Sequence, residues 1–143
     1  MDADLIRDSL ETLADRVGDP APRVYARLFA EQPGVEALFV GDRTGAARGE
    51  MLALAFEILL DLAQGGGGPS NMIGSELVNH DGLGVPPAAF ASFFPIVAAV
   101  VRDGLGEAWT AGHAAAWADL LERADGLIRE QAKRSGLALE GAG

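Results

Sequence analysis

Cysteine is absent from this 143-residue chain, and histidine is scarce. Without cysteine there is no disulfide, no thiolate metal site and no cysteine nucleophile, and no redox evidence for a compartment. His80 and His113 are the only histidines, too few for the usual zinc site. No Ser or Thr pattern beside them suggests a hydrolytic triad. The sequence therefore offers little for chemistry that relies on protein side chains alone.

Basic residues are also few, with 11 Lys and Arg against 21 Asp and Glu and a net charge of −10. Binding to nucleic acid or to an anionic membrane surface needs clustered cations, so we expect neither as a partner. We find no apolar run of membrane-spanning length, and the acidic N-terminus is unlike a signal peptide. We therefore expect a cytoplasmic protein whose acidic surface favours solubility and could dock a basic reductase.

Apolar residues recur at helical spacing, and no segment shows sustained period-two alternation. Ile6, Leu10, Leu13 and Val17 form one such stripe, with Asp2 as the expected helix cap. The same reasoning predicts helices over residues 2–17, 22–32, 33–39, 46–64, 70–80, 86–103 and 110–133. We therefore expect an all-α domain over residues 1–135 and a frayed tail over 136–143.

His80 stands at the end of a short apolar helix, before a glycine-containing loop. A lone histidine near an apolar face is either a structural group or a ligand. One imidazole can hold a metal when a cofactor supplies the other ligands, as the four porphyrin nitrogens of haem do. Such a site needs an apolar lining and a helix across its other face, and this sequence offers both.

Three blocks of sequence follow one another in a recognisable order. They are VYARLFAEQPGVEALF over residues 24–39, LVNH over residues 77–80 followed by Gly84, Val85 and Phe90, and Ala116–Trp117. With this order and spacing, residues 4–130 resemble the globin family, specifically bacterial single-domain haemoglobins and the globin part of flavohaemoglobins. The resemblance implies a globin-like fold of about seven helices around a pocket for haem b. It also implies reversible binding of a diatomic gas (O2, NO or CO) at the haem iron.

The resemblance assigns a role to three of these residues. His80 is expected to bind the iron through Nε2, while its Nδ1–H donates to a backbone carbonyl one turn earlier. Phe39 is expected to pack flat against the porphyrin, with a place in the ordinary core as the alternative. Tyr25 is expected to donate a hydrogen bond to bound O2, with an ordinary half-buried helix tyrosine as the alternative.

The helix over 46–64 is expected to cross the distal face, with Ala47 and Met51 facing the iron. The family usually has His or Gln at the position assigned to Ala47, so Tyr25 is left as the sole evident donor. Met51 is expected to be an apolar wall, and a thioether ligand is the less favoured alternative. Further expected haem contacts are Leu77, Val85, Phe90, Phe93, Phe94, Leu127 and, for the haem carboxylates, Arg43 and Arg48. For Val85, the three phenylalanines and Leu127, a place in the ordinary core is an equal alternative.

The proximal side departs from the flavohaemoglobin pattern. Phe90 stands where those chains often have a tyrosine, and the position of their glutamate on the last helix falls near Ala132. Without this His–Tyr–Glu network the imidazole of His80 is expected to be less anionic. His113 is interpreted as a surface or interhelical residue and not as a ligand, and Trp109 and Trp117 are interpreted as packing residues.

Three functions remain open at this point. The first is a gas-binding globin, which the order of Tyr25, Phe39 and His80 favours. The second is an NO dioxygenase, which would need a separate reductase because these 143 residues hold no flavin or nicotinamide domain. The third is a haem-free or gas-sensing helical module that acts through a partner.

Overall fold

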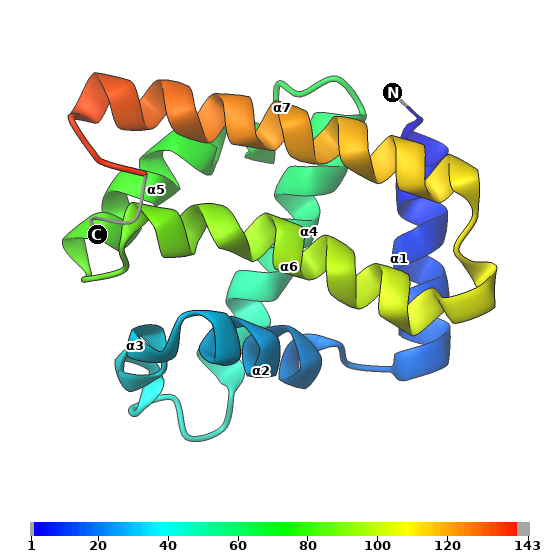
Figure 1. Ribbon diagram of the computed structural model, residues 1–143, viewed down its shortest axis with the longest axis horizontal. Coiled ribbons are helices and arrows are strands. Elements are labelled where there is room, and N and C mark those ends of the chain that lie inside the picture. Colours follow the sequence, from blue (N-terminus) through cyan, green and yellow to red (C-terminus); the bar gives the residue numbers. More distant parts are fainter. Residues whose placement is uncertain (1, 140–143) are drawn as a thin grey trace.

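The computed structural model describes residues 2–139, and this part of the chain is all helical, without strands. Figure 1 shows the arrangement of its helices. The α-helices are α1 (Ala3–Val17), α2 (Ala21–Glu31), α3 (Pro33–Glu36), α4 (Ala46–Ala63), α5 (Ile73–Gly82), α6 (Pro87–Leu105) and α7 (Ala111–Ser135). Short 3-10 turns follow as η1 (Ala37–Phe39), η2 (Pro69–Met72) and η3 (Gly106–Ala108). The all-α prediction is confirmed.

Local sequence signals explain where the helices begin and end. The carboxylate of Asp2 accepts the N–H groups of Asp4 and Leu5 at 3.1 and 3.2 Å, which caps α1 as predicted. Proline lies in the first turn of α2, α3 and α6, where its missing N–H costs no helical hydrogen bond. Gly136 ends α7 in the left-handed conformation, with φ of 66°.

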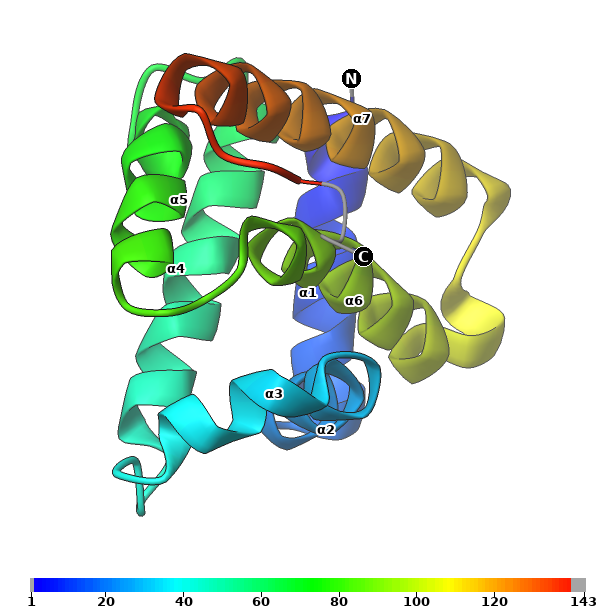
Figure 2. The ribbon, with the colours of Figure 1, turned by 60° about the vertical axis from the view of Figure 1, so that its left-hand side comes forward.

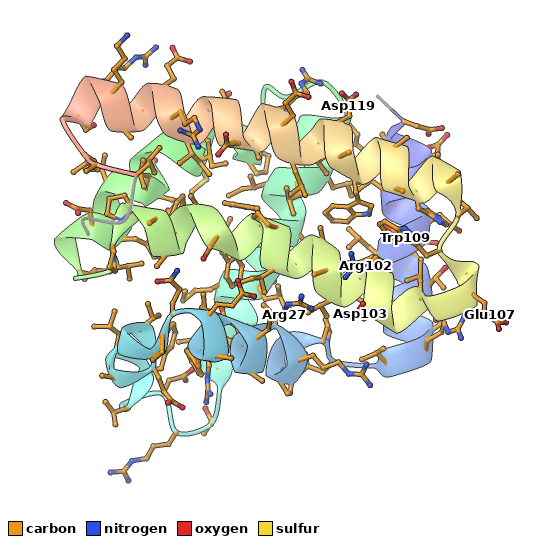
Figure 3. All side chains as sticks on the ribbon, viewed as in Figure 1. Arg27, Arg102, Asp103, Glu107, Trp109 and Asp119 are labelled. Carbon is orange, nitrogen blue, oxygen red and sulfur yellow. The ribbon has the colours of Figure 1, made fainter. Side chains whose placement is uncertain are left out.

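The helices pack at steep angles around one apolar core. In Figure 1, α6 and α7 cross the molecule side by side, and α1 packs against both. Figure 2 shows α2 and α3 across one end of α4, and α7 across the other end. An ion pair between Arg27 and Asp103 (3.2 Å) ties α2 to α6, and both residues are visible in Figure 3.

One described helical stretch, Pro87–Ala108, is long and apolar enough to cross a membrane by length and composition alone. This corrects the expectation that no apolar run reaches that length. A core helix passes the same test, and α6 packs against α1, α2, α5 and α7. Val97, Val101 and Leu105 on α6 are fully buried. The buried face of α6 therefore forms part of the core of this fold, although only 39% of the apolar stretch is buried.

Trp117 joins α7 to α1 through a buried hydrogen bond. Its indole Nε1–H donates to the Ser9 hydroxyl at 2.9 Å, and that hydroxyl donates to the carbonyl of Ile6 at 2.7 Å. Both Trp117 and Ser9 are buried. Their polar atoms are thus satisfied within the protein, as expected for a packing tryptophan.

His113 makes a second connection between the same two helices. Its Nδ1 accepts the backbone N–H of Thr110 at 3.0 Å, and its Nε2–H donates to the Asp8 carboxylate at 2.9 Å. The Thr110 hydroxyl accepts the His113 N–H, so the pair forms a capping box at the start of α7. Trp109 stacks on the imidazole with centroids 5.7 Å apart. Of the two positions that the sequence left open for His113, surface or interhelical, the structure shows the interhelical one.

The segment after α7 folds back onto the core. The N–H of Leu137 donates to the carbonyl of Ala132 at 2.9 Å, and Leu137 and Leu139 pack against the buried cluster. Residues 140–143, which belong to the tail expected to fray, lie outside the described residues.

Candidate functional site

An apolar pocket lies among α2, α3, η1, α4, α5 and α6, and His80 forms part of its wall. The cavity itself has a volume of about 100 Å³, and the roughly 690 Å³ of atom-free space around it includes open solvent at its mouth. Its walls are nearly all aliphatic or aromatic, as in most small-molecule sites. The lining residues are Leu28, Val35, Phe39, Met51, Leu54, Ala55, Ile58, Glu76, His80, Val85, Ala89, Phe90, Phe93 and Phe94.

The ring of His80 is held from one side. Its Nδ1 lies 2.7 Å from the backbone carbonyl of Glu76, one turn earlier in α5, which is the hydrogen bond predicted from the sequence. Because the carbonyl can only accept, Nδ1 carries the proton and the lone pair is left on Nε2. No group within residues 2–139 forms a hydrogen bond with that Nε2. The site therefore contains one oriented nitrogen with an unused lone pair.

The opposite side of the pocket is formed by α4. Met51, Leu54, Ala55 and Ile58 line it at spacings of three and four residues, which places them on one helix face. Ala47, expected beside Met51, is instead exposed, and its N–H donates to the Asp42 carboxylate at 3.1 Å. Ala47 lies in the first turn of α4, where an acidic cap holds the backbone, so it does not contribute to the pocket.

Three aromatic rings pack beside Tyr25, and two of them separate it from the pocket interior. Tyr25 contacts Phe29, Phe39 and Phe93 with centroids 5.9, 5.5 and 5.6 Å apart. Phe39 and Phe93 line the pocket, whereas Tyr25 does not. Tyr25 was expected in the pocket wall, but in the structure the rings of Phe39 and Phe93 lie between it and the pocket.

The hydroxyl of Tyr25 is buried and has no hydrogen-bond partner within residues 2–139. Tyr25 is 2% exposed. Burial raises its pKa well above the usual 10, and the charges of Arg48, which lowers it, and Asp42, which raises it, are smaller influences. The phenol is therefore a protonated donor at neutral pH, and an unpaired buried donor is rare enough to call for an explanation.

A second, more polar pocket touches the other side of Tyr25, and Arg48 and Glu36 are also in its wall. Arg48 is not free there, because its guanidinium donates to both the carboxylate and the carbonyl of Asp42 at 3.0 and 2.9 Å. Burial opposes ionisation of Asp42, but the Arg48 and Ala47 N–H groups and the Arg48 guanidinium outweigh it and lower its pKa.

Four other residues expected at the site also lie elsewhere. Arg48 belongs to the second pocket, and Arg43 is exposed in the loop before α4. Leu77 is fully buried in the core, and Leu127 packs at its margin. Leu77 and Leu127 sit on α5 and α7, which contact each other closely. Both side chains therefore contribute to the packing of these two helices instead of the pocket wall.

Other pocket residues were not assigned to the site from the sequence. Those on α4 could have been predicted from the sequence, because Leu54, Ala55 and Ile58 follow Met51 at helical spacing and so lie on the same face of the helix. Leu28 and Val35 belong to the first sequence block, but either position is equally typical of core. Nothing in the sequence indicates that Glu76 faces the pocket, because charged residues on helices usually face solvent. The remaining residue missed is Ala89 on α6, whereas Phe94 on the same helix was expected in the wall and does line the pocket.

The donor set suits a cofactor that brings its own ligands. Within residues 2–139 no group of three or more His, Cys, Asp and Glu residues could hold a metal ion alone. One imidazole with a free Nε2, facing an apolar pocket, fits haem, in which a single protein nitrogen completes the iron coordination. Comparisons of the chain with protein-family models, curated proteins and solved structures find no match.

Proposed function

We propose that this protein is a globin-like haem protein that reversibly binds a diatomic gas, with His80 as the protein ligand of the iron. The observation that carries the proposal is the state of His80. Its Nδ1 is held by a backbone carbonyl at 2.7 Å, while its Nε2 has no partner among the described residues, and its ring borders an apolar pocket. The order of Tyr25, Phe39 and His80 in the globin-like sequence blocks supports it.

Haem, when bound, supplies an iron that takes one protein nitrogen and one small gas molecule. The hydrogen bond from Nδ1 to Glu76 fixes the tautomer and the rotation of the His80 ring. Phe39 and Phe90 provide aromatic surface, and Phe90 also contacts the imidazole with centroids 5.2 Å apart. Met51 lies on the α4 wall with aliphatic neighbours, so we assign it to exclusion of water instead of ligation.

In this proposal Tyr25 contributes the donor once the Phe39 or Phe93 ring beside it shifts with the bound cofactor, because in this structure both rings line the pocket and Tyr25 does not. Its hydroxyl is protonated, buried and unpaired, and its ring packs edge-on against Phe39 at the pocket wall. A donor kept out of water interacts strongly with a polarised ligand, because little solvent competes with it. The unpaired state of this phenol is explained if its partner arrives only with the cofactor and the gas.

The proposal is tested by adding haem to the purified protein and recording visible spectra of the reduced form with and without CO. We expect an intense Soret band that shifts with CO in the wild type. In His80→Ala both the band and its shift should be lost or much weakened. His113→Ala is the matched control, because that imidazole is already paired at both nitrogens. A wild type that binds no haem, or an equal response in His80→Ala, would refute the proposal.

A further inference from the structure

Among the described residues, Glu76 is the single acidic one in the wall of the apolar pocket described above. Its side chain, like that of His80, is only 20% exposed, although most glutamates of this chain sit on exposed helix faces. One carboxylate oxygen of Glu76 lies 3.6 Å from Nδ1 of His80. The same residue also supplies the carbonyl that accepts the Nδ1–H at 2.7 Å. Both the backbone and the side chain of Glu76 therefore face the protonated side of this imidazole.

We propose that Glu76 is a positioning residue that makes the His80 imidazole a stronger electron donor toward the iron. This inference rests on the proposed haem-binding function and adds to it. It also replaces the expectation that the imidazole lacks an anionic partner, which followed from Phe90 and Ala132 occupying the positions of a tyrosine and a glutamate. The acidic partner comes from α5 itself, one turn before the ligand.

The physical argument concerns the charge that the imidazole sees. A carboxylate beside Nδ1–H polarises that bond and leaves more electron density on the imidazole ring. The opposite nitrogen, Nε2, then becomes a stronger electron donor. At 3.6 Å the carboxylate is beyond a normal hydrogen bond, but both side chains are only 20% exposed, so little water screens its charge from the ring. Phe90 covers another side of the ring, with centroids 5.2 Å apart. It offers no competing donor or acceptor.

The geometry also explains why this acid tolerates an apolar wall. A carboxylate on an aliphatic surface is costly unless a polar group lies near it. Here the nearest such group is the polarised N–H of His80, and the 20% exposure of Glu76 leaves part of its carboxylate hydrated. The attraction to this N–H therefore favours the side-chain conformation in which the carboxylate lies next to the imidazole over one that points into solvent.

The test uses Glu76→Gln, which keeps the size of the side chain and removes its charge. Asp119→Asn is the matched control, because it also removes one negative charge but from the exposed surface of α7, as Figure 3 shows. Circular dichroism first verifies that both variants fold. Haem is then added, and three quantities are measured: the one-electron midpoint potential of the iron, the iron–imidazole stretching frequency of the reduced protein, and the equilibrium affinity for ferric haem.

We expect Glu76→Gln to favour the reduced iron about tenfold, which corresponds to a rise of about 59 mV in midpoint potential for one electron. The iron–imidazole frequency should fall, because a less basic nitrogen bonds more weakly. Affinity for ferric haem should drop by about tenfold, which is typical for loss of an outer partner of a metal-binding histidine. Asp119→Asn should match the wild type in all three.

Two results would overturn the inference, and they differ. If the wild type binds haem through His80 but Glu76→Gln matches Asp119→Asn in potential and frequency, Glu76 has no such role and the proposed function stands. If the wild type binds no haem, the proposed function fails and this inference fails with it.

Discussion

The two histidines of this chain sit in opposite polar environments. His113, on the seam between α1 and α7, has both ring nitrogens paired, one with the Thr110 N–H and one with the Asp8 carboxylate. His80, on α5, uses one nitrogen for a carbonyl of its own helix, and its other nitrogen has no partner among the described residues. A histidine with both nitrogens paired stabilises the fold, whereas one with a free lone pair beside an apolar pocket is available to a ligand.

The same contrast separates the two largest polar aromatic groups of the core. Trp117, in the α1–α7 seam, donates its N–H to Ser9 at 2.9 Å. Tyr25, next to the pocket, has a buried hydroxyl without a partner in the part of the chain that the structure describes. Satisfied polar groups are the rule in protein interiors, and exceptions concentrate at functional sites. Unused hydrogen-bonding capacity therefore gathers on the pocket side of this molecule.

The largest effect on stability is expected at His113. Replacing it by alanine removes the bonds to Thr110 and Asp8 and half of the capping box, and should lower the free energy of unfolding by about 1–3 kcal/mol. His113→Gln should recover part of this loss, since glutamine also completes a capping box. Urea unfolding monitored by circular dichroism measures both. A His113→Ala variant as stable as the wild type would contradict the structural role of this residue.

A pair of variants with opposite effects sharpens the comparison of the two polar aromatics. Tyr25→Phe removes an unpaired hydroxyl, so the haem-free protein should gain about 1–2 kcal/mol of stability. Ser9→Ala removes the acceptor of the buried Trp117 N–H and should cost a similar amount. Urea midpoints at constant slope report both changes.

With haem bound, Tyr25→Phe should also release O2 faster, which stopped-flow displacement by CO measures. A loss of stability in haem-free Tyr25→Phe would show that the hydroxyl has a partner in the protein. An unchanged rate of O2 release would show that another group acts as the donor, or that none is needed.

The smallest effect on stability is expected at Asp61. This residue lies near the C-terminal end of α4, beyond the residues of that helix that line the pocket. Hydrogen bonds from the Ser70 hydroxyl and N–H lower the pKa of Asp61, and the Gly68 N–H adds to them against the cost of desolvation. The folded protein thus binds this proton less readily than the unfolded chain does. The contribution of Asp61 to the free energy of unfolding is fully present at pH values above its ordinary pKa of 3.8. It is lost as the pH falls below 3.8 toward the lowered pKa of the folded protein.

Asp61→Asn should therefore destabilise the protein slightly at pH 7, with the difference from the wild type shrinking below pH 3.8. Thermal unfolding across this range measures the difference. A gap between the two proteins that widens in acid would mean that the sign assigned to this carboxylate is wrong.

Helix boundaries could be predicted because their signals are local. Asp2, the prolines in first turns and Gly136 act on backbone groups within a few residues. The hydrogen bond from His80 to the carbonyl one turn earlier was also predictable, since it is made within α5. Any helical histidine with that rotamer can form it.

The errors at the site concern positions set by packing between helices. The loop over residues 40–45 separates Phe39 from α4, and its length alone does not determine which turn of α4 reaches the pocket. Asp42 caps α4 and keeps Ala47 in the exposed first turn, so the pocket face starts one turn later at Met51. Glu76 could not be recognised from the sequence, because its inward orientation depends on α5 packing beside the pocket.

Chemical complementation of position 80 tests the central claim most directly. His80→Gly removes the ring and leaves space for free imidazole. Visible spectra of the reduced, haem-treated variant are recorded with CO, with and without added imidazole. The account predicts that the Soret band and its CO shift are lost in the variant and return with imidazole. If His80→Gly without imidazole gives the wild-type spectrum, or if imidazole restores nothing, the Nε2 of His80 is not what holds the iron.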